Sequence, residues 1–462
     1  MDIKSIILSA GKSKRFKSNI PKVLHKICDK PMIEIIIDNV KKIIEEKNIF
    51  VVVGHEKEKI ISFLEKKYSD LNFVVQEEQK GTAHAVLCCK DKLKNYKGWI
   101  LILCGDMPLI KENTLRDFIS YSMGKNIDIS FISTTFENPE GFGRVLKDRN
   151  GNVLRIVEEK DASYEIKKIK EINTGIYLVK SNILFKLLQD VKSENAQREY
   201  YLPDIIEIGL KKGMNVNCYF SENSLEFIGV NTKLQLSQAE NILLKWKIEE
   251  LMLNGVIFIK PETSFIGYDV KIGVDTKIYP GNFITGNTEI GKNCIIGMNN
   301  FIKDTIISDN VSVKGFSYIE KAKVSEETQI GPFAHLRPET VIGKKCKVGN
   351  FVEVKKSIFE DGVKASHLSY LGDSYIGENT NIGAGTITCN YDGVKKHKTI
   401  IGKNVFIGSD TQLVAPVKVG DYTLIAAGTT VTKDVGENYL VHSRTKQQNI
   451  SEKGMKKRLK KT

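Results

Sequence analysis

One loop near the start of the sequence, within the stretch LSAGKSKRFKSNIPKVLHKI at residues 8–27, carries the positively charged side chains Lys12, Lys14, Arg15, Lys17 and Lys22. The loop follows a short apolar run, SIILS, and contains Gly11, where the missing side chain lets backbone N–H groups approach a phosphate closely. Arg15 and Lys22 would supply mobile countercharge to that phosphate. The pattern is neither GxxxxGK[ST] nor GxGxxG, which excludes a Walker P-loop and a dinucleotide fingerprint. By itself the loop is equally compatible with solvated lysines.

Two further stretches place polar side chains where apolar strands are expected to end. QEEQKGTAHAV puts Gln76 after a strand and Gly81 and Thr82 at a helix start, positions that can bind a base edge and an anion. WILILCGDMP ends an apolar strand near Asp106, and a carboxylate there is a natural Mg²⁺ ligand beside a triphosphate. Asp106 could instead cap a helix or form a turn, but the following Pro108 favours the ligand. The three stretches together predict an Mg²⁺-dependent nucleotide site.

The elements that must position these residues alternate along the first half of the chain. Short apolar runs such as SIILS, IFVVVG and WILILCGD alternate with helical patterns such as PMIEIIIDNVKKIIEE and EKIISFLEKKY. This alternation predicts an α/β domain over residues 1–230, Rossmann-like with a mostly parallel sheet. Ligands of such sheets bind at the carboxyl ends of the strands, which would bring the three stretches together.

A different repeat begins near Gly255, where Ile-Gly and Val-Gly pairs replace the helical patterns. In a hexapeptide repeat each short strand forms one side of a triangular coil, with an aliphatic residue inside and glycine at the turn. The sequence therefore predicts a left-handed parallel β-helix over residues 255–445, rather than a loop-rich β-sandwich with chance glycines. The glycine pairs that are six residues apart are 267 and 273, 291 and 297, 343 and 349, 377 and 383, and 402 and 408.

Residues 231–254 separate the two patterns and are predicted to form an amphipathic linker helix. Gly255 suits the end of that helix. Residues 446–462 form a basic tail, which we expect to be solvated unless a partner orders it. The apolar residues at helical spacing in the linker are Leu236, Ala239, Leu243, Trp246 and Leu251.

The chain has 462 residues and a formal net charge of +13, a balance compatible with nucleic acid, acidic membranes or anionic small substrates. Arg is scarce and scattered, whereas base recognition favours Arg with interleaved aromatic residues, so we expect no nucleic-acid partner. No apolar run approaches the length of a membrane helix or of the core of a signal peptide. Eight cysteines without CxxC spacing indicate reduced thiols, so we expect a soluble cytoplasmic protein.

Several short stretches occur in order along the chain: LSAGKSKRF, PKVLH, QKGTAHA, CGDMPL, GFGRV, IVEEKDA, EINTGIY and GVNTKLQL. They resemble the uridyltransferase domain of the bifunctional N-acetylglucosamine-1-phosphate uridyltransferase/glucosamine-1-phosphate acetyltransferase family, and the match runs from residue 5 to about residue 445. The resemblance assigns Lys22 and Arg15 to the phosphates of UTP, and Asp106 with Asn231 to Mg²⁺. It assigns the nucleotide to Ser9, Ala10, Gly11, Gln76, Gly81 and Thr82, and the sugar phosphate to Gly141, Glu158, Asn173 and Asn231.

One position departs from the family pattern. The family usually has Gly-Thr after the loop lysine, where this chain has Ser13 and Lys14. Ser13 costs backbone freedom beside the triphosphate, and Lys14 adds positive charge. We expect an effect on nucleotide affinity and none on the identity of the site.

The β-helix region also carries polar stretches that a structural coil does not need, among them FAHLRPE, GNFVEVKKS, KASHLSYLGD and SRTKQQ. The insertion CNYDGVKKHKTI at 389–400 breaks the repeat, as a functional loop leaving a regular coil would. A lone histidine is more often structural than catalytic, yet the resemblance makes His367 the general base that deprotonates the attacking amine of glucosamine-1-phosphate. It assigns the sugar phosphate to Arg337, Lys355, Tyr370 and Asn381, and acetyl-CoA to Ala384, Asn390, Tyr391, Ser409, Ala427 and Arg444.

The resemblance implies two reactions that yield UDP-N-acetylglucosamine for cell-envelope sugars such as peptidoglycan and lipopolysaccharide. The C-terminal half would acetylate glucosamine-1-phosphate with acetyl-CoA, and the N-terminal half would transfer UMP from UTP to N-acetylglucosamine-1-phosphate. A homotrimer is expected as well, because in this family neighbouring subunits complete the acetyltransferase site.

Two other hypotheses stay open at this point. A monofunctional sugar-nucleotide pyrophosphorylase could carry a purely structural β-helix, but such proteins lack the set of His367, Asn390-Tyr391 and Arg444. A non-catalytic assembly factor could share the two-part architecture, but the presence of Lys22, Asp106 and Asn231 argues against it.

Overall fold

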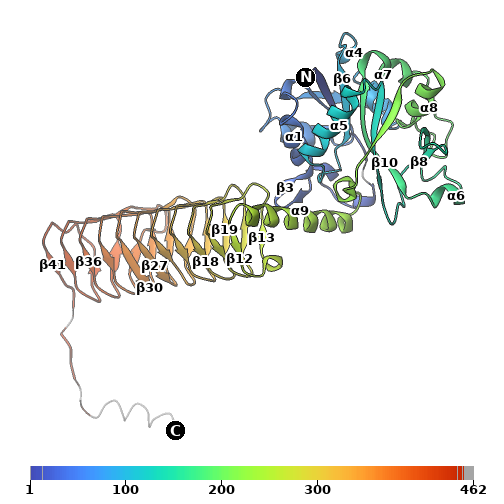
Figure 1. Ribbon diagram of the computed structural model, residues 1–462. Helices are drawn as coiled ribbons and strands as arrows, with labels where there is room; N and C mark the ends of the chain where they lie inside the picture. Colours follow the sequence, from blue (N-terminus) through green and yellow to red (C-terminus); the bar gives the residue numbers. More distant parts are fainter. Residues whose placement is uncertain (1, 13, 445, 450, 452–462) are drawn as a thin grey trace, which may run out of the picture. The chain divides into compact units, whose positions relative to one another are not determined.

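The structure of the chain, a computed structural model, describes residues 2–12, 14–444, 446–449 and 451. It divides into two compact units, Met1–Leu243 and Leu244–Thr462 (Figure 1). Ser13, on which the expected change in the glycine loop rests, lies outside the described residues, and so do residues 452–462 of the basic tail.

The N-terminal unit is built on a mostly parallel sheet, as the sequence predicts. Only β10 runs against its neighbours in the main strand order, because it pairs antiparallel with both β6 and β7 (Glu171–Lys180, Trp99–Cys104 and Ile129–Thr135). The strand order is β11 (Val216–Phe220), β7, β10, β6, β1 (Ile3–Ser9), β4 (Ile49–Val53) and β5 (Asn72–Val75).

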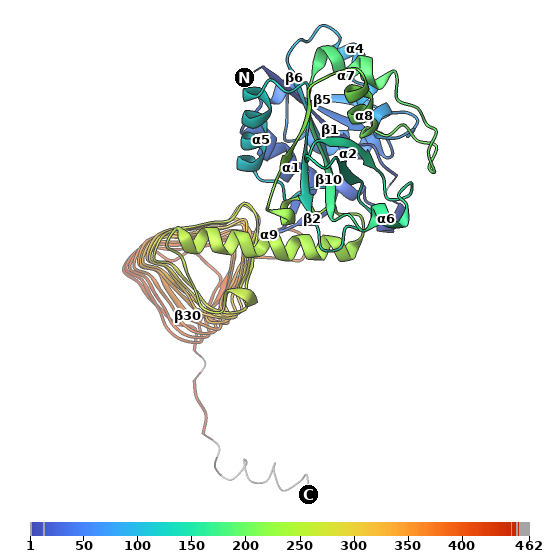
Figure 2. The same ribbon diagram turned by 45° about the vertical axis from the view of Figure 1, so that its right-hand side comes forward.

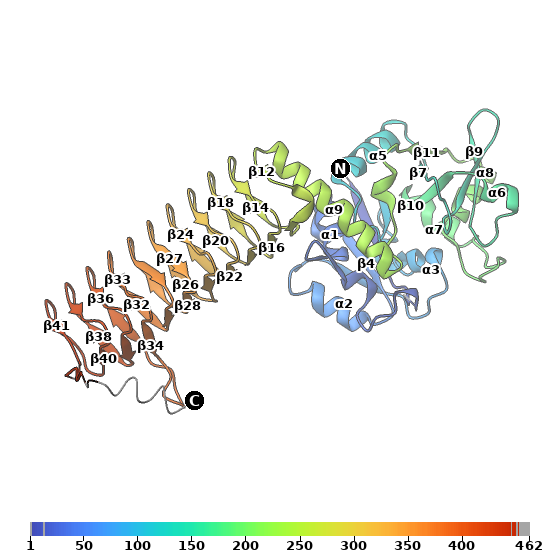
Figure 3. The same ribbon diagram turned by 90° about the horizontal axis from the view of Figure 1, so that it is seen from below.

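Helices cover both faces of this sheet. Successive side chains of a strand point to opposite faces, so neighbouring residues of one strand pack against different helices. Ile6 and Ile7 of β1 are both fully buried, yet they belong to different apolar clusters. The cluster of Ile7 contains residues of α1 (Met32–Lys41), α2 (Lys57–Leu64) and α5 (Glu112–Gly124), which Figure 3 labels. The cluster of Ile6 contains residues of α3 (Thr82–Leu87), α4 (Lys90–Leu93), α7 (Ser181–Leu188) and α8 (Asp204–Lys211).

A hairpin of β8 (Arg144–Lys147) and β9 (Val153–Val157) extends the sheet next to β10. Arg144 is paired with Val157 of β9 on one side and with Ile172 of β10 on the other. The loop before β8 and the loop after β9 therefore begin at the same end of the hairpin. The shorter elements of the unit are η1 (Lys14–Phe16), η2 (Lys22–Leu24), β2 (Lys26–Ile27), β3 (Lys30–Pro31), η3 (Glu46–Asn48), α6 (Tyr164–Lys167) and η4 (Ser224–Phe227).

The C-terminal unit is a left-handed parallel β-helix, as the glycine repeat predicts. Figure 2 looks nearly along its axis, and the stacked coils superpose as a triangle. Consecutive strands of the chain pass in turn to three parallel sheets, so that Lys364 pairs with Lys347 of the preceding coil and Asn381 of the following coil. Large aliphatic side chains such as Ile296, Ile330 and Val348 fill the interior.

The first sheet contains β12 (Ile257–Phe258), β15 (Lys277–Ile278), β18 (Ile295–Ile296), β21 (Ser312–Val313), β24 (Gln329–Ile330), β27 (Lys347–Asn350), β30 (Lys364–His367), β33 (Asn381–Ile382), β36 (Phe406–Ile407), β39 (Leu424–Ile425) and β41 (Leu440–Val441). The second sheet contains β13 (Phe265–Ile266), β16 (Phe283–Thr285), β19 (Phe301–Lys303), β22 (Tyr318–Glu320), β25 (His335–Leu336), β28 (Glu353–Lys355), β31 (Tyr370–Gly372), β34 (Ile387–Cys389), β37 (Gln412–Val414) and β40 (Thr430–Val431). The third sheet contains β14 (Lys271–Ile272), β17 (Glu289–Ile290), β20 (Ile306–Ile307), β23 (Ala322–Val324), β26 (Thr340–Ile342), β29 (Ile358–Phe359), β32 (Ser374–Ile376), β35 (Thr399–Ile401) and β38 (Val417–Val419).

Helix α9 (Lys233–Leu253) contains the boundary between the two units. It ends in a Schellman arrangement: the Gly255 N–H donates to the Met252 carbonyl oxygen, and the Val256 N–H donates to the Leu251 carbonyl oxygen. Gly255 has a φ of +90°, a left-handed conformation that glycine adopts without strain. The short helix η5 (Pro261–Thr263) follows in the first coil.

Two observations bear on the class of protein. No disulfide joins any of the cysteines that the structure describes. Within the described part of the chain, no helix combines the length and the apolar character that crossing a membrane requires.

Candidate active sites

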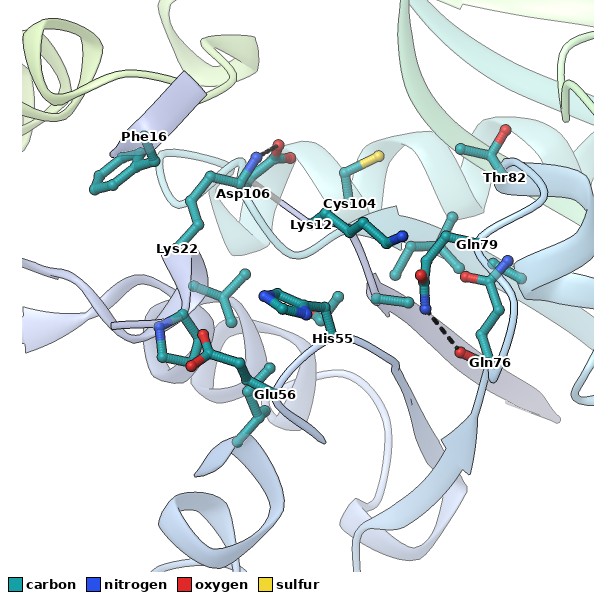
Figure 4. Close-up of a pocket in the computed structure, with 18 of the residues that line it drawn as sticks. Lys12, Phe16, Lys22, His55, Glu56, Gln76, Gln79, Thr82, Cys104 and Asp106 are labelled. Atoms are coloured by element: carbon teal, nitrogen blue, oxygen red, sulfur yellow. Dashed lines mark hydrogen bonds and ion pairs between the residues drawn. The ribbon is translucent and has the colours of Figure 1, made fainter. Parts of the chain in front are cut away.

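The carboxyl ends of β1, β4 and β5 lie in register at one edge of the N-terminal sheet, where Ser9 pairs with Val53 and Val53 with Val75. A cavity of ≈ 570 Å³ opens at this edge, beside the end of β6 (Figure 4). The structure thus brings the three polar stretches of the N-terminal half to one place. The predicted site residues that line the cavity are Ser9, Ala10, Gly11, Lys22, Gln76, Gly81, Thr82 and Asp106.

Gly81 and Gln76 shape one wall of the cavity. Gly81 has a φ of +112°, and a Cβ atom added to it would lie 2.4 Å from the Tyr200 carbonyl oxygen, so no other residue fits there without displacement. The buried Gln76 side chain donates from Nε2 to the Gly81 carbonyl oxygen at 3.1 Å. Thr82 accepts a hydrogen bond at Oγ1 from the Leu202 N–H at 3.0 Å. Contacts with residues 200–202 therefore fix the start of α3.

Lys22 lies at the centre of a polar cluster at the other side of the cavity. Its Nζ donates to Asp106 Oδ2 at 2.6 Å and to Asn231 Oδ1 at 3.0 Å. Arg15 donates from Nη2 to the same Asn231 oxygen at 3.2 Å. Figure 4 shows Lys22 and Asp106 directed toward each other. Residues separated by more than two hundred positions in the sequence thus meet around one ammonium group.

The Asp106 carboxylate and the Asn231 amide oxygen fit a Mg²⁺ ion. Both are hard oxygen donors, and both contact the same ammonium nitrogen, so they point to a common position that favours positive charge. Two protein ligands are enough for this metal, because Mg²⁺ commonly keeps several waters and takes further ligands from substrate phosphates. No cluster of three or more His, Cys, Asp or Glu side chains with metal-binding geometry occurs in the described part of the chain.

The residues predicted to bind the amino sugar lie around the β8–β9 hairpin. Gly141 is in the loop before β8, Glu158 directly follows β9, and Asn173 is in β10. The Asn173 N–H donates to the Gly143 carbonyl oxygen at 2.9 Å. A Cβ atom on Gly143 would lie 3.0 Å from Glu158 Oε1. Asn173 and Glu158 thus both approach Gly143, which lies two residues after Gly141. None of the three predicted residues is among those that line the cavity.

Burial changes the acidity of several groups near this site. Burial raises the pKa of Glu158 to about 7, and the negative charges of Asp204 and Asp161 contribute to the rise. Burial likewise raises the pKa of Asp204 to about 6, with the Glu207 and Asp161 charges as further causes. Burial raises the pKa of the Cys104 thiol to about 12, so this cavity-lining thiol is protonated at neutral pH and is unsuited to nucleophilic attack.

Sequence reasoning missed several residues that line the cavity. Gln79 donates from Nε2 to the Gln76 carbonyl oxygen at 3.1 Å, and Figure 4 shows it with Lys12 among the lining residues. Lys12 and Gln79 belong to stretches that the sequence had already marked as functional, so a signal for them existed. His55 and Glu56 follow β4 without any recognisable motif. The missed residues are Lys12, His55, Glu56, Gln79 and Glu199.

A second polar cluster lies on the outer face of the second sheet of the β-helix. The Asn390 side-chain amide donates to Asp373 Oδ2 at 2.5 Å and to the Tyr370 hydroxyl at 3.5 Å. The Lys355 ammonium lies 3.9 Å from the same Asp373 oxygen. One coil earlier, Arg337 forms an ion pair with Glu353 at 2.8 Å. Two predicted phosphate-binding cations and a predicted sugar-binding tyrosine therefore share this face.

His367 is the last residue of β30, at the corner between the first and second sheets. Its Nδ1 lies 2.8 Å from Asn350 Oδ1, the side chain paired with it in the preceding coil. This contact orients the imidazole ring, and Nε2 remains for proton transfer. Ala384 and Ser409 accept backbone hydrogen bonds from the following coils at the same corner. Arg444 donates from Nε to the Ala427 carbonyl oxygen at 3.4 Å.

Two predicted residues stand apart from these groups. Asn381 begins β33 of the first sheet, where it pairs with Lys364, so it lies on a different sheet from Tyr370. Tyr391 is exposed in the 389–400 insertion, and its hydroxyl donates to the Gly393 carbonyl oxygen at 2.6 Å. Within one chain, the residues predicted for acetyl transfer are therefore distributed over two faces and a corner.

Models of known protein families match both halves of the chain. A family described as nucleotidyl transferase matches residues 4–247. A family described as the GMPPB C-terminal domain matches residues 319–414, and the bacterial transferase hexapeptide family of six repeats matches residues 398–433.

Relatives with the printed name "Bifunctional protein GlmU" match over nearly the whole chain. The protein from Geotalea uraniireducens is 46% identical over 448 residues, which cover 97% of this chain and 98% of the relative. The protein from Clostridium kluyveri is 45% identical over 460 residues, which cover 98% of this chain and 99% of the relative. The protein from Thermodesulfovibrio yellowstonii is 46% identical over 458 residues, which cover 99% of this chain and 100% of the relative.

Proposed function

The chain belongs to the family of the bifunctional protein GlmU, and we propose that its two units perform successive transfers in UDP-N-acetylglucosamine synthesis. The C-terminal unit acetylates glucosamine-1-phosphate with acetyl-CoA. The N-terminal unit transfers UMP from UTP to the resulting N-acetylglucosamine-1-phosphate and releases pyrophosphate. Full-length similarity to relatives with this name does not favour a monofunctional pyrophosphorylase with a structural β-helix.

The uridylyl transfer needs positioning and charge compensation from the N-terminal unit. A phosphate oxygen of the sugar phosphate attacks the α-phosphorus of UTP in line with the leaving pyrophosphate, so no covalent enzyme intermediate is required. Lys22 and Arg15 offset the negative charge that accumulates on the phosphates. Gly11 lets the backbone after β1 approach the triphosphate closely.

Asp106 and Asn231 are the residues that would hold Mg²⁺. When bound, the metal supplies fixed positive charge to the phosphates. Lys22 donates to both oxygens, so its ammonium group occupies the position beside the Asp106 carboxylate and the neutral Asn231 amide. Its flexible four-carbon stem lets the ammonium reach from these oxygens to a phosphate.

The acetyl transfer needs a base and a phosphate anchor from the C-terminal unit. His367 takes the proton of the glucosamine-1-phosphate amine as this nitrogen attacks the thioester carbonyl carbon of acetyl-CoA, and CoA leaves as the thiol. Asn350 holds the imidazole in orientation through its 2.8 Å contact with Nδ1. Lys355 and Arg337 bind the phosphate of the sugar.

The C-terminal unit also carries an exposed apolar column beside His367. Phe316, Phe333, Phe351 and Leu368 occupy the same corner in successive coils, and neighbouring phenylalanine rings stack at 5.2 Å. Each of the four residues is about half exposed and has a positive φ, which large side chains rarely adopt. Large exposed apolar patches typically mark interaction surfaces. This column supports a homotrimer in which a neighbouring copy covers it and brings further residues to His367.

A cytoplasmic location stays a prediction from the cysteines. The described cysteines form no disulfide, as is usual for proteins of reducing compartments.

The convergence of Lys22, Asp106 and Asn231 beside the cavity is the single observation that carries the proposal. The test is to incubate the purified full chain with glucosamine-1-phosphate, acetyl-CoA, UTP and Mg²⁺, and to follow released CoA and released pyrophosphate. We expect both products, with pyrophosphate dependent on prior acetylation. Release of neither product would overturn the proposal.

Two substitutions test the division of labour between the units. His367→Ala should lower CoA release by about 100-fold to 10,000-fold, the range of general-base catalysis, and leave pyrophosphate release from supplied N-acetylglucosamine-1-phosphate unchanged. Asp106→Ala should lower pyrophosphate release and leave CoA release unchanged. Equal loss of both products in either variant would contradict the assignment of one reaction to each unit.

A further inference from the structure

Arg144 is a charged side chain buried below the loops that carry the predicted sugar-binding residues. It is only 2% exposed and is among the largest fully buried side chains of the chain. A buried guanidinium needs partners, and its Nη2 lies 2.8 Å from Glu159 Oε2 while its Nη1 donates to the Phe142 carbonyl oxygen. The transfer chemistry proposed above does not use this ion pair.

The ion pair connects the two loops at the end of the β8–β9 hairpin. Glu159 belongs to the loop after β9, and its Oε2 also accepts a hydrogen bond from the Gly141 N–H at 3.3 Å. Gly141 belongs to the loop before β8 and is predicted to bind the sugar. One carboxylate oxygen therefore binds both the guanidinium and the backbone of a predicted sugar-binding residue. Lys167 approaches the other oxygen of Glu159 at 3.4 Å.

The remaining predicted sugar-binding residues depend on the same short segment. Glu158 is the chain neighbour of Glu159, and its carbonyl oxygen accepts from the Asp161 N–H at 3.0 Å. Gly143 precedes Arg144, accepts from the Asn173 N–H at 2.9 Å, and would meet Glu158 Oε1 if it carried a Cβ atom. A shift of the ion pair would therefore move these residues together.

The contacts of the Arg144 guanidinium leave one of its donors unsatisfied. Among the described residues, the buried Arg144 Nε has no hydrogen-bond partner. An unsatisfied buried donor destabilises the folded state, and apolar side chains can replace a buried ion pair without loss of stability. The geometry that the planar guanidinium imposes on both loops explains its presence better than stability does.

We propose that the Arg144–Glu159 ion pair is a positioning device for the sugar end of the uridyltransferase site, which sets the affinity for the sugar phosphate by fixing Gly141 and Glu158 relative to each other. This inference rests on the proposed function of the N-terminal unit. Arg144 acts through these two residues and is a positioning residue. Lys22, Arg15 and Asp106 bind UTP and metal independently of it.

The test measures steady-state kinetics of pyrophosphate release by the full chain carrying Arg144→Lys or Glu159→Gln. Arg144→Lys keeps the charge but loses the two-pronged contact, and Glu159→Gln keeps the shape but loses the charge. Because small misplacements of binding groups are costly, we expect KM for N-acetylglucosamine-1-phosphate to rise about tenfold in each variant. KM for UTP should stay unchanged, which also shows that the N-terminal unit is folded.

The double variant separates coupling from independent damage. If both side chains act through one contact, the combined change in KM for the sugar phosphate should be no larger than that of either single variant. Multiplication of the two effects in the double variant would overturn the proposal. A parallel rise of KM for UTP in both single variants would also overturn it, because the effect would then be general to the unit.

Lys147→Gln is the matched control. Lys147 lies on the same strand as Arg144 and forms a 2.6 Å ion pair with Glu171, away from the two loops. We expect KM for the sugar phosphate to stay at the wild-type value, and an equal rise in this variant would overturn the specific role of Arg144. Absence of pyrophosphate release by the wild-type chain would defeat the proposed function, whereas an active wild type with unaffected Arg144 and Glu159 variants would defeat this inference alone.

Discussion

Glu158 and Asp106 are two carboxylates of the N-terminal unit with opposite surroundings. Asp106 forms an ion pair with the Lys22 ammonium at 2.6 Å. Glu158 is buried and faces the negative charges of Asp204 and Asp161, so its pKa rises to about 7. Asp106 is therefore suited to bind a cation, while Glu158 changes its protonation state near neutral pH and with it the number of hydrogen bonds it can accept.

This difference predicts a pH dependence of sugar binding. In the proposed site Glu158 binds sugar hydroxyls, and a carboxylate accepts hydrogen bonds best when ionised, so KM for N-acetylglucosamine-1-phosphate should fall as the pH rises through about 7. The measurement is KM for N-acetylglucosamine-1-phosphate at intervals between about pH 6 and 8, in the wild type and in Glu158→Gln. This range spans neutrality, where a carboxylate with such a raised pKa titrates. Ionisation of the substrate phosphate affects both proteins equally, so an identical pH profile in the two would contradict the prediction.

The same pKa shift has a defined sign for stability. The folded chain holds the Glu158 proton more tightly than the unfolded chain, because its pKa is raised from 4.5 to about 7. This contribution to stability is fully present at pH values below 4.5 and is lost as the pH rises through about 7. The sugar site thus gains binding strength over the same pH range in which it loses stability.

Lys22 and Asp106 could be predicted from the sequence, because each follows an apolar run that ends at the carboxyl edge of a parallel sheet. The pairing of Arg144 with Glu159 could not be predicted, because it depends on the register of the β8–β9 hairpin. A register is set by packing and turn geometry, and no short motif encodes it. His55 and Glu56 line the cavity because they follow β4, whose apolar run ends at the same edge, so the rule that places Asp106 there applies to them as well.

Helix α3 shows how an element depends on one backbone conformation. Gly81 precedes it with a φ of +112° and lies against the Tyr200 backbone. Gly81→Ala should cost about 1–3 kcal/mol of stability from backbone strain alone and should raise KM for UTP, because the start of α3 must move. Thermal unfolding and KM for UTP measure the two effects.

Gly124→Ala is the control for this substitution. Gly124 is the last residue of α5, and no described atom outside its own helix backbone and chain neighbours lies within 4 Å of its added Cβ position. Alanine there should leave KM for UTP unchanged and slightly favour the helix. If Gly81→Ala leaves thermal unfolding and KM for UTP as little changed as Gly124→Ala does, residues 200–202 do not constrain the start of α3.

The elements themselves were predictable to different degrees. The alternation of apolar runs and helical patterns indicates an α/β sheet, and the glycine period indicates a β-helix, because both patterns repeat locally. The reversed direction of β10 left no such mark, because its apolar stretch around Ile176 looks the same in either orientation. The β8–β9 hairpin is short and partly exposed, so its pattern was too weak to be recognised.

The two units of the molecule have separate apolar cores, and each carries its own candidate site. The sites differ in how complete they are within one chain. The N-terminal cavity is lined by one unit, whereas the residues predicted for acetyl transfer lie on two faces and a corner of the β-helix. The acetyltransferase reaction alone is therefore expected to depend on association of several copies.

This expectation can be tested with Phe351→Glu in the apolar column. A charge in a covered apolar interface is costly, so the variant should dissociate from trimer to monomer and lose most CoA release, while pyrophosphate release persists. The molar mass in solution, measured by light scattering, and the two product assays check this outcome.

Ile358→Glu serves as the matched substitution on another face. Ile358 lies in the third sheet and is 43% exposed, compared with 56% for Phe351. It should leave both mass and CoA release at wild-type values. A Phe351→Glu variant that remains trimeric and active would show that the column is not the interface. The sequence could not reveal this column, because its members become neighbours only when the coils stack.

Helix α9 contributes Ile248 and Leu251 to the interior of the β-helix, where they join Val256 of the first coil. A stack of coils has two ends, and an uncovered end would offer its interior and its strand edges to other chains. The last turns of α9 cover one of these ends. Another chain therefore cannot add its strands to the β-helix at the end that α9 covers, and fibre-like growth from that end is blocked.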